Sequence, residues 1–256
     1  MKSGRIVILA GKGDTTNIVY NYLKNYFHIE AVVFEKGISK TNFLKKRIRK
    51  LGISKVVGQV LFQLFIVKWL DLNSKKRKKE ILEQYQLNTS SPPAEKTIHV
   101  DSVNDLNTIE ILKKLNPDLI VVNGTRIISA DVLNSSPVKF LNTHTGITPK
   151  YRNVHGAYWA IVNDDMNNCG VTVHLVDKGI DTGNIIFQKT IQITSEDNFV
   201  TYPFLQIGEG ISYLKKAIDD IFANQLKLIK GTTESRIWYH PTLVQYIRFR
   251  IKKGVK

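Results

Sequence analysis

Short, fully apolar runs alternate with helix-like patterns over the first 145 residues, and this alternation restricts the fold more than any other feature. The run RIVILA, Arg5 to Ala10, is typical of a buried strand and leads through the loop GKGDTTN into a helical pattern. EAVVF and Leu119 to Asn123 repeat the strand signal, and TIEILKKL repeats the helix signal. Strands that alternate with helices predict an α/β domain with a mostly parallel, twisted sheet flanked by helices.

The second half of the chain continues with strand-like segments and one strong helix. FLNTHT, GVTVHLVD and IIFQKTIQI read as strands, and a helix is expected from about Tyr202 to Asn224. The remaining tail is basic at its end. We therefore expect a main domain of residues 1–225 and a short basic C-terminal extension of residues 226–256.

Charge and cysteine content narrow the partners and the compartment. The chain has 37 Lys and Arg residues against 22 Asp and Glu, a net charge of +15, which indicates an anionic partner: nucleic acid, an acidic membrane surface or a phosphorylated small molecule. Cys169 is the only cysteine, so an internal disulfide and a cysteine-based zinc site are excluded. The apolar run near the N-terminus is too short for a signal peptide, and we expect a cytoplasmic protein.

Residues 36–97 are rich in lysine and arginine and are expected to form a helical insert. Within it, Val56 to Leu70 is apolar except for Gln59, Gln63 and Lys68, with KKRIRK before it and KKRKK after it. A run of roughly 15 residues falls short of the ~20 that span a bilayer. Two interpretations stay open: a core or homodimer-interface helix, or a helix on the membrane surface held by its basic flanks, which would make the protein membrane-peripheral.

The stretch LNTHTGITPKYRNVHG places two polar side chains on one face of a predicted strand. Asn142 and His144 are two residues apart and therefore point the same way, where an amide and an imidazole can stabilise an oxyanion and move a proton. Taken alone, the pair is better explained as a hydrogen-bonded structural pair. The later segment VDKGIDTGNII places Asp177 and Asp181 in a tight loop, and a carboxylate beside His144 would raise the pKa of that histidine and orient it. With no Ser or Cys paired to them, these residues suit acyl transfer to an amine.

These motifs carry a family resemblance. NTHTGITPKYRNVHGAYWAI followed by CGVTVHLVDKGIDTGNII resembles the folate-dependent formyltransferases, which include the glycinamide ribonucleotide, methionyl-tRNA and sugar N-formyltransferases. The resemblance covers roughly residues 1–35 and 98–225 and implies a Rossmann-like formyltransferase fold, with residues 1–225 as the catalytic domain. It implies 10-formyltetrahydrofolate as donor, a primary amine as acceptor, and Asn142, His144 and Asp181 as the catalytic residues.

The resemblance also implies where the two substrates bind. The segment NGTRIIS and the loop around Asp177 match the family's folate site, which gives as donor-binding residues Gly124, Thr125, Arg126, Ile127, Ile128, Asp177 and Gly179. A glycine loop at a helix start and the basic segment after the catalytic strand can bind an anionic acceptor. The expected acceptor-binding residues are Gly11, Lys12, Gly13, Asp14, Thr15, Lys150, Tyr151, Arg152 and His155.

The length and the basic insert favour a nucleotide-linked amino sugar as acceptor, for surface glycan biosynthesis, with no nucleic-acid partner. Formylation of methionyl-tRNA or glycinamide ribonucleotide, hydrolysis of formyltetrahydrofolate, and a non-catalytic basic binding module are the alternatives. His174 is expected to be a hydrogen-bonded core residue. The sequence lacks metal-ligand spacings such as H-E-x-x-H, so no metal is predicted.

Overall fold

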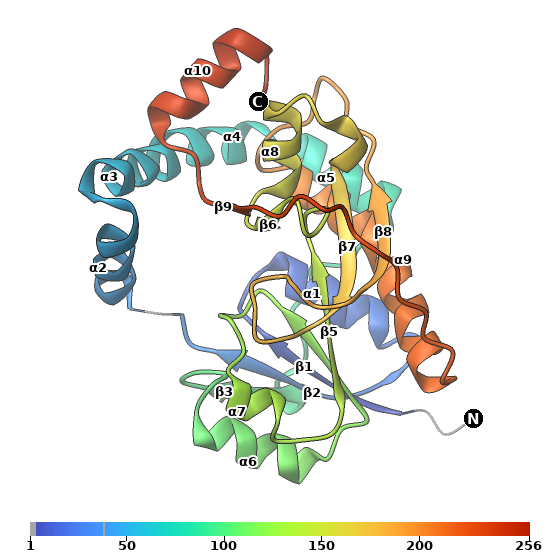
Figure 1. Cartoon of the computed structure of the whole chain (residues 1–256). Coiled ribbons are helices and arrows are strands. Elements are labelled where there is room, and N and C mark those ends of the chain that lie inside the picture. Colours follow the sequence, from blue (N-terminus) through green and yellow to red (C-terminus); the bar gives the residue numbers. More distant parts are fainter. Residues whose placement is uncertain (1–3, 38) are drawn as a thin grey trace.

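The computed structural model describes residues 4–37 and 39–256, so that residues 1–3 and Ile38 of the predicted domain lie outside the description. Its main feature is a seven-stranded sheet with the order β3-β2-β1-β4-β5-β7-β8 (Figure 1). The first five strands are parallel, and the last two are antiparallel to their neighbours. This arrangement confirms the predicted mostly parallel sheet. The strands are β1 (Arg5–Ala10), β2 (His28–Glu35), β3 (Thr97–Val100), β4 (Leu119–Asn123), β5 (Lys139–His144), β7 (Gly170–Leu175) and β8 (Ile185–Thr190).

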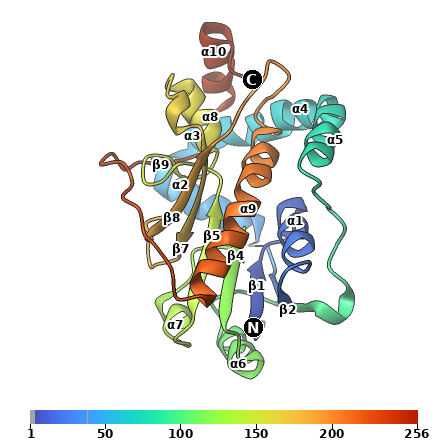
Figure 2. The same ribbon diagram turned by 90° about the vertical axis from the view of Figure 1, so that its right-hand side faces the viewer.

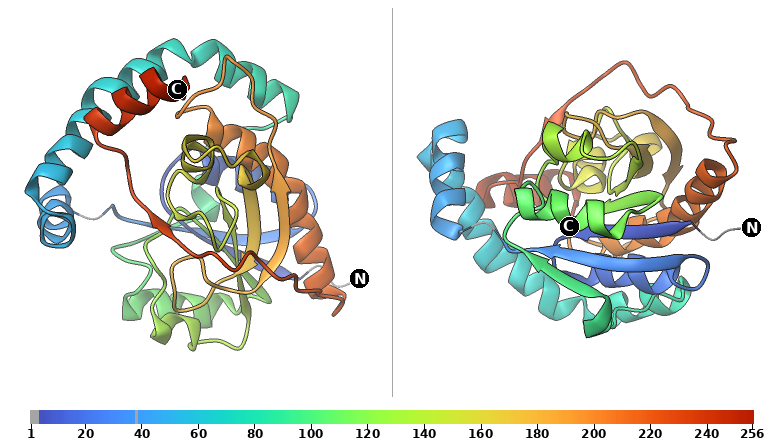
Figure 3. Two further views of the ribbon diagram at one scale, coloured as in Figure 1. Left: turned by 45° about the horizontal axis from the view of Figure 1, so that its top comes forward. Right: turned by 90° about the horizontal axis from the view of Figure 1, so that it is seen from below.

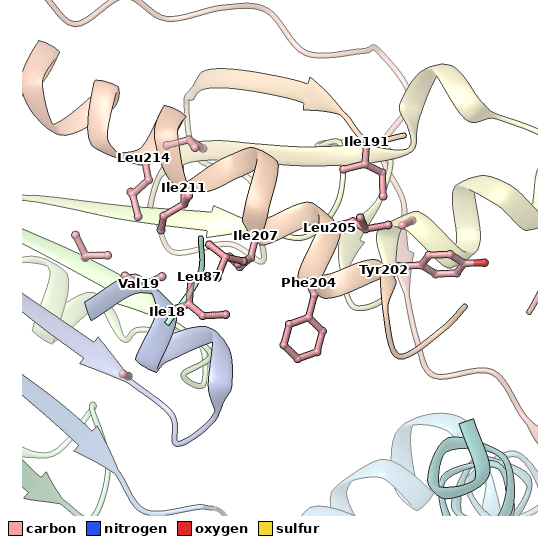
Figure 4. Packing of buried hydrophobic residues seen from close by; sticks show 14 of the residues in the cluster. Ile18, Val19, Leu87, Ile191, Tyr202, Phe204, Leu205, Ile207, Ile211 and Leu214 are labelled. Carbon is pink, nitrogen blue, oxygen red and sulfur yellow. The ribbon is translucent and has the colours of Figure 1, made fainter. Parts of the chain in front are cut away.

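Helices cover both faces of the sheet, and the side chains of β1 show how the two cores divide. Ile6 and Ile8 join a cluster with α1 (Asp14–Leu23) and α9 (Tyr202–Phe222), whereas Val7 and Leu9 join a second cluster with α6 (Leu106–Leu115) and α7 (Ala130–Leu133). Successive strand residues face opposite sides, so one apolar run serves both cores. Figure 2 shows α9 against its face of the sheet, and Figure 4 shows Ile18 and Val19 near Ile207 and Ile211.

The basic segment forms helices that arch along one side of the molecule (Figures 1 and 3). It comprises α2 (Lys40–Leu51), α3 (Ile53–Leu61), the π-helical turn η1 (Phe62–Val67), α4 (Lys68–Asn73) and α5 (Lys75–Gln84), and returns through the short η2 (Ala94–Lys96) to β3. The elements α3, η1 and α4 form one continuous helix, Ile53–Asn73, which we call the outer helix. Within the described residues it is the one helix long and apolar enough to cross a membrane, a weak criterion that core helices of soluble proteins also meet.

The C-terminal segment is more ordered than the basic extension that we expected. The two-residue strand β9 (Ile237–Trp238) pairs with β6 (Arg152–Asn153), which lies just before α8 (Gly156–Val162). A short 3₁₀ turn, η3 (Met166–Asn168), precedes β7. The chain then forms α10 (Leu243–Lys253), whose start is fixed by a capping box. The capping residue Thr242 packs against the outer helix, since a Cβ on Gly58 would lie 2.9 Å from the Cβ of Thr242.

Candidate active site

A pocket of about 310 Å³ lies beyond the carboxyl ends of β4 and β5. Parallel neighbouring strands end at the same edge of a sheet, which is where α/β proteins bind ligands. The loop after β4, the start of α1 and the loop after β7 complete the walls of this pocket. The three residues predicted as catalytic, Asn142, His144 and Asp181, all line it.

His144 is buried at the end of β5, and both nitrogens of its ring face acceptors. Its Nε2 lies 2.8 Å from the carbonyl oxygen of Tyr151, and its Nδ1 lies 3.4 Å from Oδ2 of Asp181. Gly146 permits this close approach, because a Cβ there would lie 2.4 Å from the Tyr151 oxygen and 2.8 Å from the His144 ring. The Nε2–H therefore donates to Tyr151, which leaves Nδ1 to carry the lone pair on the Asp181 side.

Asp181 acts to raise the pKa of His144, as we expected, but the net pKa of this histidine lies below its usual value. Burial lowers this pKa, and the opposing effects of the Asp181 carboxylate and the Tyr151 carbonyl only partly compensate. His174 adds a smaller lowering contribution to the pKa of His144. The imidazole is thus neutral at pH 7 and able to accept a proton.

Asp181 is held in a strained position by its loop. Its φ is 49°, in the left-handed region that few non-glycine residues adopt, and its Oδ2 accepts a hydrogen bond from the backbone N–H of Asn153 at 2.8 Å. Burial raises the pKa of Asp181, but His144, His174 and the Asn153 N–H together lower it below its usual value. The carboxylate therefore stays ionised beside His144.

Asp177 shapes the same loop. Its Oδ1 accepts hydrogen bonds from the Gly179 N–H at 3.0 Å and from the Thr182 hydroxyl at 2.7 Å. An Asp side chain that bonds backbone two residues on is a common way to fix a turn. Asp177 thus lines the pocket while one of its carboxylate oxygens is used within the loop.

His174 is the buried, hydrogen-bonded residue that we expected, and it also lines the pocket, which the sequence interpretation missed. Its Nδ1–H donates to the carbonyl oxygen of Leu175 at 2.7 Å. In the neutral ring Nε2 is then an acceptor, and it lies 3.2 Å from Nδ2 of Asn142 and 3.7 Å from Oδ1 of Asp181. This contact fixes which end of the Asn142 amide carries the N–H groups. The antiparallel register that pairs Asn142 with His174 and His144 with Thr172 would have revealed the residue, had the pairing of β5 and β7 been anticipated.

All seven predicted donor-binding residues line this pocket: Gly124, Thr125, Arg126, Ile127, Ile128, Asp177 and Gly179. The Arg126 charge is engaged within the protein, because its Nε lies 2.6 Å from Oε2 of Glu35 and its backbone N–H donates to Oε1 of the same residue at 2.7 Å. This bidentate arrangement fixes the start of the segment that follows β4.

The predicted acceptor-binding residues lie in different parts of the structure. Thr15 lines the catalytic pocket, and Asn123 Nδ2 donates to its hydroxyl at 3.1 Å. Gly11 and Lys12 line a neighbouring pocket of about 820 Å³, which shares Gly124, Thr125 and Arg126 with the first. Gly13 and Asp14 form the start of α1.

The basic segment after β5 is largely engaged in contacts within the protein. Lys150 Nζ lies 2.9 Å from Asp165 and 3.1 Å from Glu234, and the buried Tyr151 donates its hydroxyl to Asp165 at 2.8 Å. Arg152 Nη1 donates to the carbonyl oxygen of Ile180 at 3.1 Å, beside Asp181.

His155 does not face the acceptor side as we expected. Its ring packs against Phe199 with a centroid distance of 4.2 Å, and its Nε2 lies 2.8 Å from Nδ1 of His240. Burial, with smaller contributions from His240 and Arg47, lowers the pKa of His155 well below its usual value.

Solved structures share this fold. The chain matches a 4-N formyltransferase from Francisella tularensis with a TM-score of 0.57 and 19% identity, covering 93% of this chain and 77% of the other. It also matches a sugar 3N-formyl transferase, solved in the presence of dTDP and 5-N-formyl-THF, with a TM-score of 0.52 and 22% identity, covering 93% and 70%. The chain thus has the Rossmann-like fold of these formyltransferases.

The sequence comparisons then give the family. The model of the formyl transferase family matches residues 68–203, more than half of the chain, and the chain belongs to that family. A curated relative, the methionyl-tRNA formyltransferase of Pelotomaculum thermopropionicum, is 38% identical over 96 residues, which cover 37% of this chain and 30% of the relative. The chain thus matches about a third of the length of that relative.

Proposed function

We propose that the chain is an N-formyltransferase that moves a formyl group from 10-formyltetrahydrofolate to the primary amine of a nucleotide-linked amino sugar, for surface glycan synthesis. One observation carries this proposal: an amide, a neutral imidazole and an ionised carboxylate converge in one pocket. None of the described residues that line the pocket is a serine or cysteine, so the attacking nucleophile is best supplied by the substrate.

The pocket suits a folate, which supplies a formyl group carried on nitrogen. Its volume of about 310 Å³ and that of its neighbour fall in the range of small-molecule sites. The residues from Gly124 to Ile128 would hold the pterin on one side, and the loop from Asp177 to Asp181 would hold it on the other. Family membership and the neighbour solved with 5-N-formyl-THF support this placement.

Asn142 is arranged to stabilise the formyl oxygen. One N–H of its amide is directed to His174, and the second is free to donate to an oxygen in the pocket that becomes negative as the amine attacks. A donor fixed in advance costs little reorganisation, and the loss of one such donor typically lowers the rate about 10²- to 10³-fold.

His144 and Asp181 are arranged to move the proton that the reaction releases. The new C–N bond leaves an extra proton on the acceptor nitrogen, and the broken C–N bond requires one on the leaving nitrogen. His144 Nδ1 can take the first proton while Nε2 stays bonded to Tyr151, and the Asp181 carboxylate then stabilises the imidazolium. The same proton is returned to the leaving nitrogen, so the protein ends unchanged.

The acceptor would enter through the neighbouring pocket, where Lys12 provides positive charge for phosphates. Lys36 lines the same pocket, with its Nζ 2.6 Å from Oδ1 of Asp101. Phe43 and His99 line the same pocket and offer rings to a base. The sugar N-formyltransferases of similar fold support a nucleotide-linked sugar. Methionyl-tRNA is the second candidate acceptor, supported by the curated relative and by the net charge of +15.

The test is to incubate the protein with 10-formyltetrahydrofolate and a panel of nucleotide-linked amino sugars, methionyl-tRNA and glycinamide ribonucleotide, with each product followed by mass. We expect one formyl group on one sugar, and no product from the His144→Ala variant. Transfer to tRNA or to glycinamide ribonucleotide alone would overturn the choice of acceptor. Formate release without any acceptor product would identify a hydrolase.

A further inference from the structure

The outer helix, Ile53–Asn73, carries apolar residues on its solvent side as well as on its buried side. Its solvent side carries large apolar residues, with 62% of Phe65 and 65% of Leu72 exposed. Surface helices of soluble proteins normally direct such residues to the core. The exposed apolar residues of this helix are Ile53, Val57, Val60, Leu61, Leu64, Phe65, Trp69 and Leu72. They form one contiguous apolar stripe, which is typical of an interaction surface.

The inner side of the same helix is fixed to the protein by buried apolar residues and by two glutamines. Gln59 is buried and donates to the carbonyl oxygen of His240 at 2.6 Å, and Gln63 lies 2.9 Å from Nδ1 of the same histidine. Phe62 is fully buried between Phe199 and Tyr246, with ring centroid distances of 4.9 and 5.2 Å. These contacts hold the helix on the domain, so it can lie on a bilayer but cannot leave the domain to cross one.

The π-helical turn η1 keeps the stripe on one side. At about 3.6 residues per turn, an uninterrupted α-helix would rotate Leu72 roughly 100° away from Ile53. A π-turn accommodates one extra residue and removes that rotation, so both residues face solvent. The same register brings Val56, Phe62 and Leu70 to the inner side.

The positive charge around the apolar stripe indicates which partner binds it. Residues 40–79 hold 13 of the 37 Lys and Arg residues and 1 of the 22 acidic residues, so this segment accounts for +12 of the net +15. A second copy docked on the stripe would bring two such charges together, whereas anionic phospholipid headgroups would neutralise them. The basic runs lie at both ends of the outer helix, which is the pattern of helices that lie in the interface of a membrane.

The helix α10 extends the apolar surface. It lies beside α3 and α4 in Figure 3 and exposes Val244, Ile247 and Ile251. Its Arg250 guanidinium lies over the Trp69 ring at 5.9 Å, which places a cation beside an aromatic ring as at membrane interfaces.

We propose that the outer helix and α10 dock this protein onto the surface of an anionic phospholipid bilayer. The exposed stripe enters the region between headgroups and acyl chains, and exposed flanking lysines such as Lys76 and Lys79 bind the headgroups. The catalytic pocket remains outside the bilayer. The docking is independent of the acceptor that the enzyme formylates.

Co-sedimentation with vesicles of phosphatidylcholine containing phosphatidylglycerol tests the proposal against pure phosphatidylcholine vesicles. We expect binding to the anionic vesicles, with a blue shift of Trp69 fluorescence, since Trp159 and Trp238 are buried. Phe65→Glu should weaken the binding at least about tenfold because it places a charge in the acyl region. The matched control is Leu106→Glu on α6, where 79% of Leu106 is exposed away from the stripe, and it should bind like the unchanged protein.

Three outcomes would overturn the proposal. The first is absence of binding to anionic vesicles. The second is binding that is released by salt, without a Trp69 shift and without any effect of Phe65→Glu, which would indicate charge alone. The third is a protein that does not bind vesicles and forms a dimer that the Phe65→Glu substitution dissociates. Formyl transfer to a water-soluble acceptor, measured on the same Phe65→Glu protein, should be unchanged, so failure of docking and failure of the proposed function are distinguished.

Discussion

The pocket around His144, which we propose to be catalytic, and the outer helix both depart from the ordinary distribution of polar and apolar residues, in opposite ways. In the pocket, His144 and His174 are polar side chains almost fully buried, and each is hydrogen-bonded. On the outer helix, Phe65 and Leu72 are apolar side chains left in solvent. Buried polar groups and contiguous exposed apolar residues are the deviations that carry information about ligands. The buried polar groups of the pocket indicate a small polar ligand, and the exposed apolar residues of the outer helix indicate a partner with an apolar surface.

The pocket and the outer helix also differ in the contacts that maintain their structure. The pocket depends on the register of β5 and β7 and on a strained Asp181, so its geometry belongs to the core of the sheet. The apolar stripe consists of exposed side chains, whereas the contacts of the outer helix with Phe199 and His240 are made by its other side. Substitutions should therefore separate chemistry, stability and docking.

The largest effect is expected in the pocket. Asn142→Ala, His144→Ala and Asp181→Ala should each nearly abolish formyl transfer, with a loss of at least about 10²- to 10³-fold, because each removes a group that acts on developing charge. Product mass measured over time checks this. Asp181→Asn is the sharper variant, since Asn tolerates the left-handed φ of 49° and keeps the loop while it removes the charge. Full activity in any of them, with an unchanged melting temperature, would contradict the assignment.

Two substitutions on opposite sides of the outer helix compare how much each side contributes to stability. Phe62→Ala should lower the free energy of unfolding by about 3–5 kcal/mol, because the fully buried ring is replaced by a cavity. Phe65→Ala, three positions along, should change it by less than about 0.5 kcal/mol. Urea unfolding of the two variants gives both values. Equal losses would mean that the outer side also packs against the protein.

Much of the sheet could be predicted, because strands covered on both faces read as continuous apolar runs. Arg5 to Ala10 and Leu119 to Asn123 were predicted with the bounds that β1 and β4 have. The strand β3 was missed because Thr97–Val100 is short and includes the exposed His99. The helix α10 was missed because its apolar residues Val244, Ile247 and Ile251 face outward among basic ones.

At the site, too, local sequence patterns predicted some residues and missed those whose role depends on long-range packing. Asn142 and His144 were predicted because residues two apart on a strand share a face, which is local information. His174 required the register of two antiparallel strands, and the fall in the pKa of His144 required its burial. The role of His155 was expected from its place after the PKYR segment, but its partner His240 is far along the chain. Local pattern gives the chemistry of a site, and long-range packing decides its electrostatics.

A pH effect on stability should arise where the outer helix meets the C-terminal segment. Burial, with a smaller effect from Arg47, lowers the pKa of His240 to about 4, and the pKa of its neighbour His155 is also lowered. The unfolded chain binds more protons than the native one below pH 6.5, so stability is full above that pH and falls as the pH drops towards 4. For His240 alone the loss is on the order of 3 kcal/mol.

Urea unfolding at pH 7 and pH 4.5 measures this loss. His240→Gln should reduce the dependence of the unfolding free energy on pH between those values, because it removes one of the two buried imidazoles. An equally steep dependence in the variant would place the sensitive groups elsewhere, such as at His144 in the pocket.

The smallest effect is expected at His174, which touches Asn142, the proposed oxyanion donor, and acts through it. His174→Ala should lower kcat roughly tenfold with little change in KM, because the Asn142 amide loses the acceptor that fixes its orientation. His174→Gln, whose carbonyl oxygen can accept the same hydrogen bond, should restore part of the loss. The acidic limb of the rate should lie below pH 6.5, where the lowered pKa of His144 places it, and should stay there in both variants. A limb that moves with His174 would mean that His174 takes part in the proton transfer, and that the pocket uses two imidazoles where we assign one.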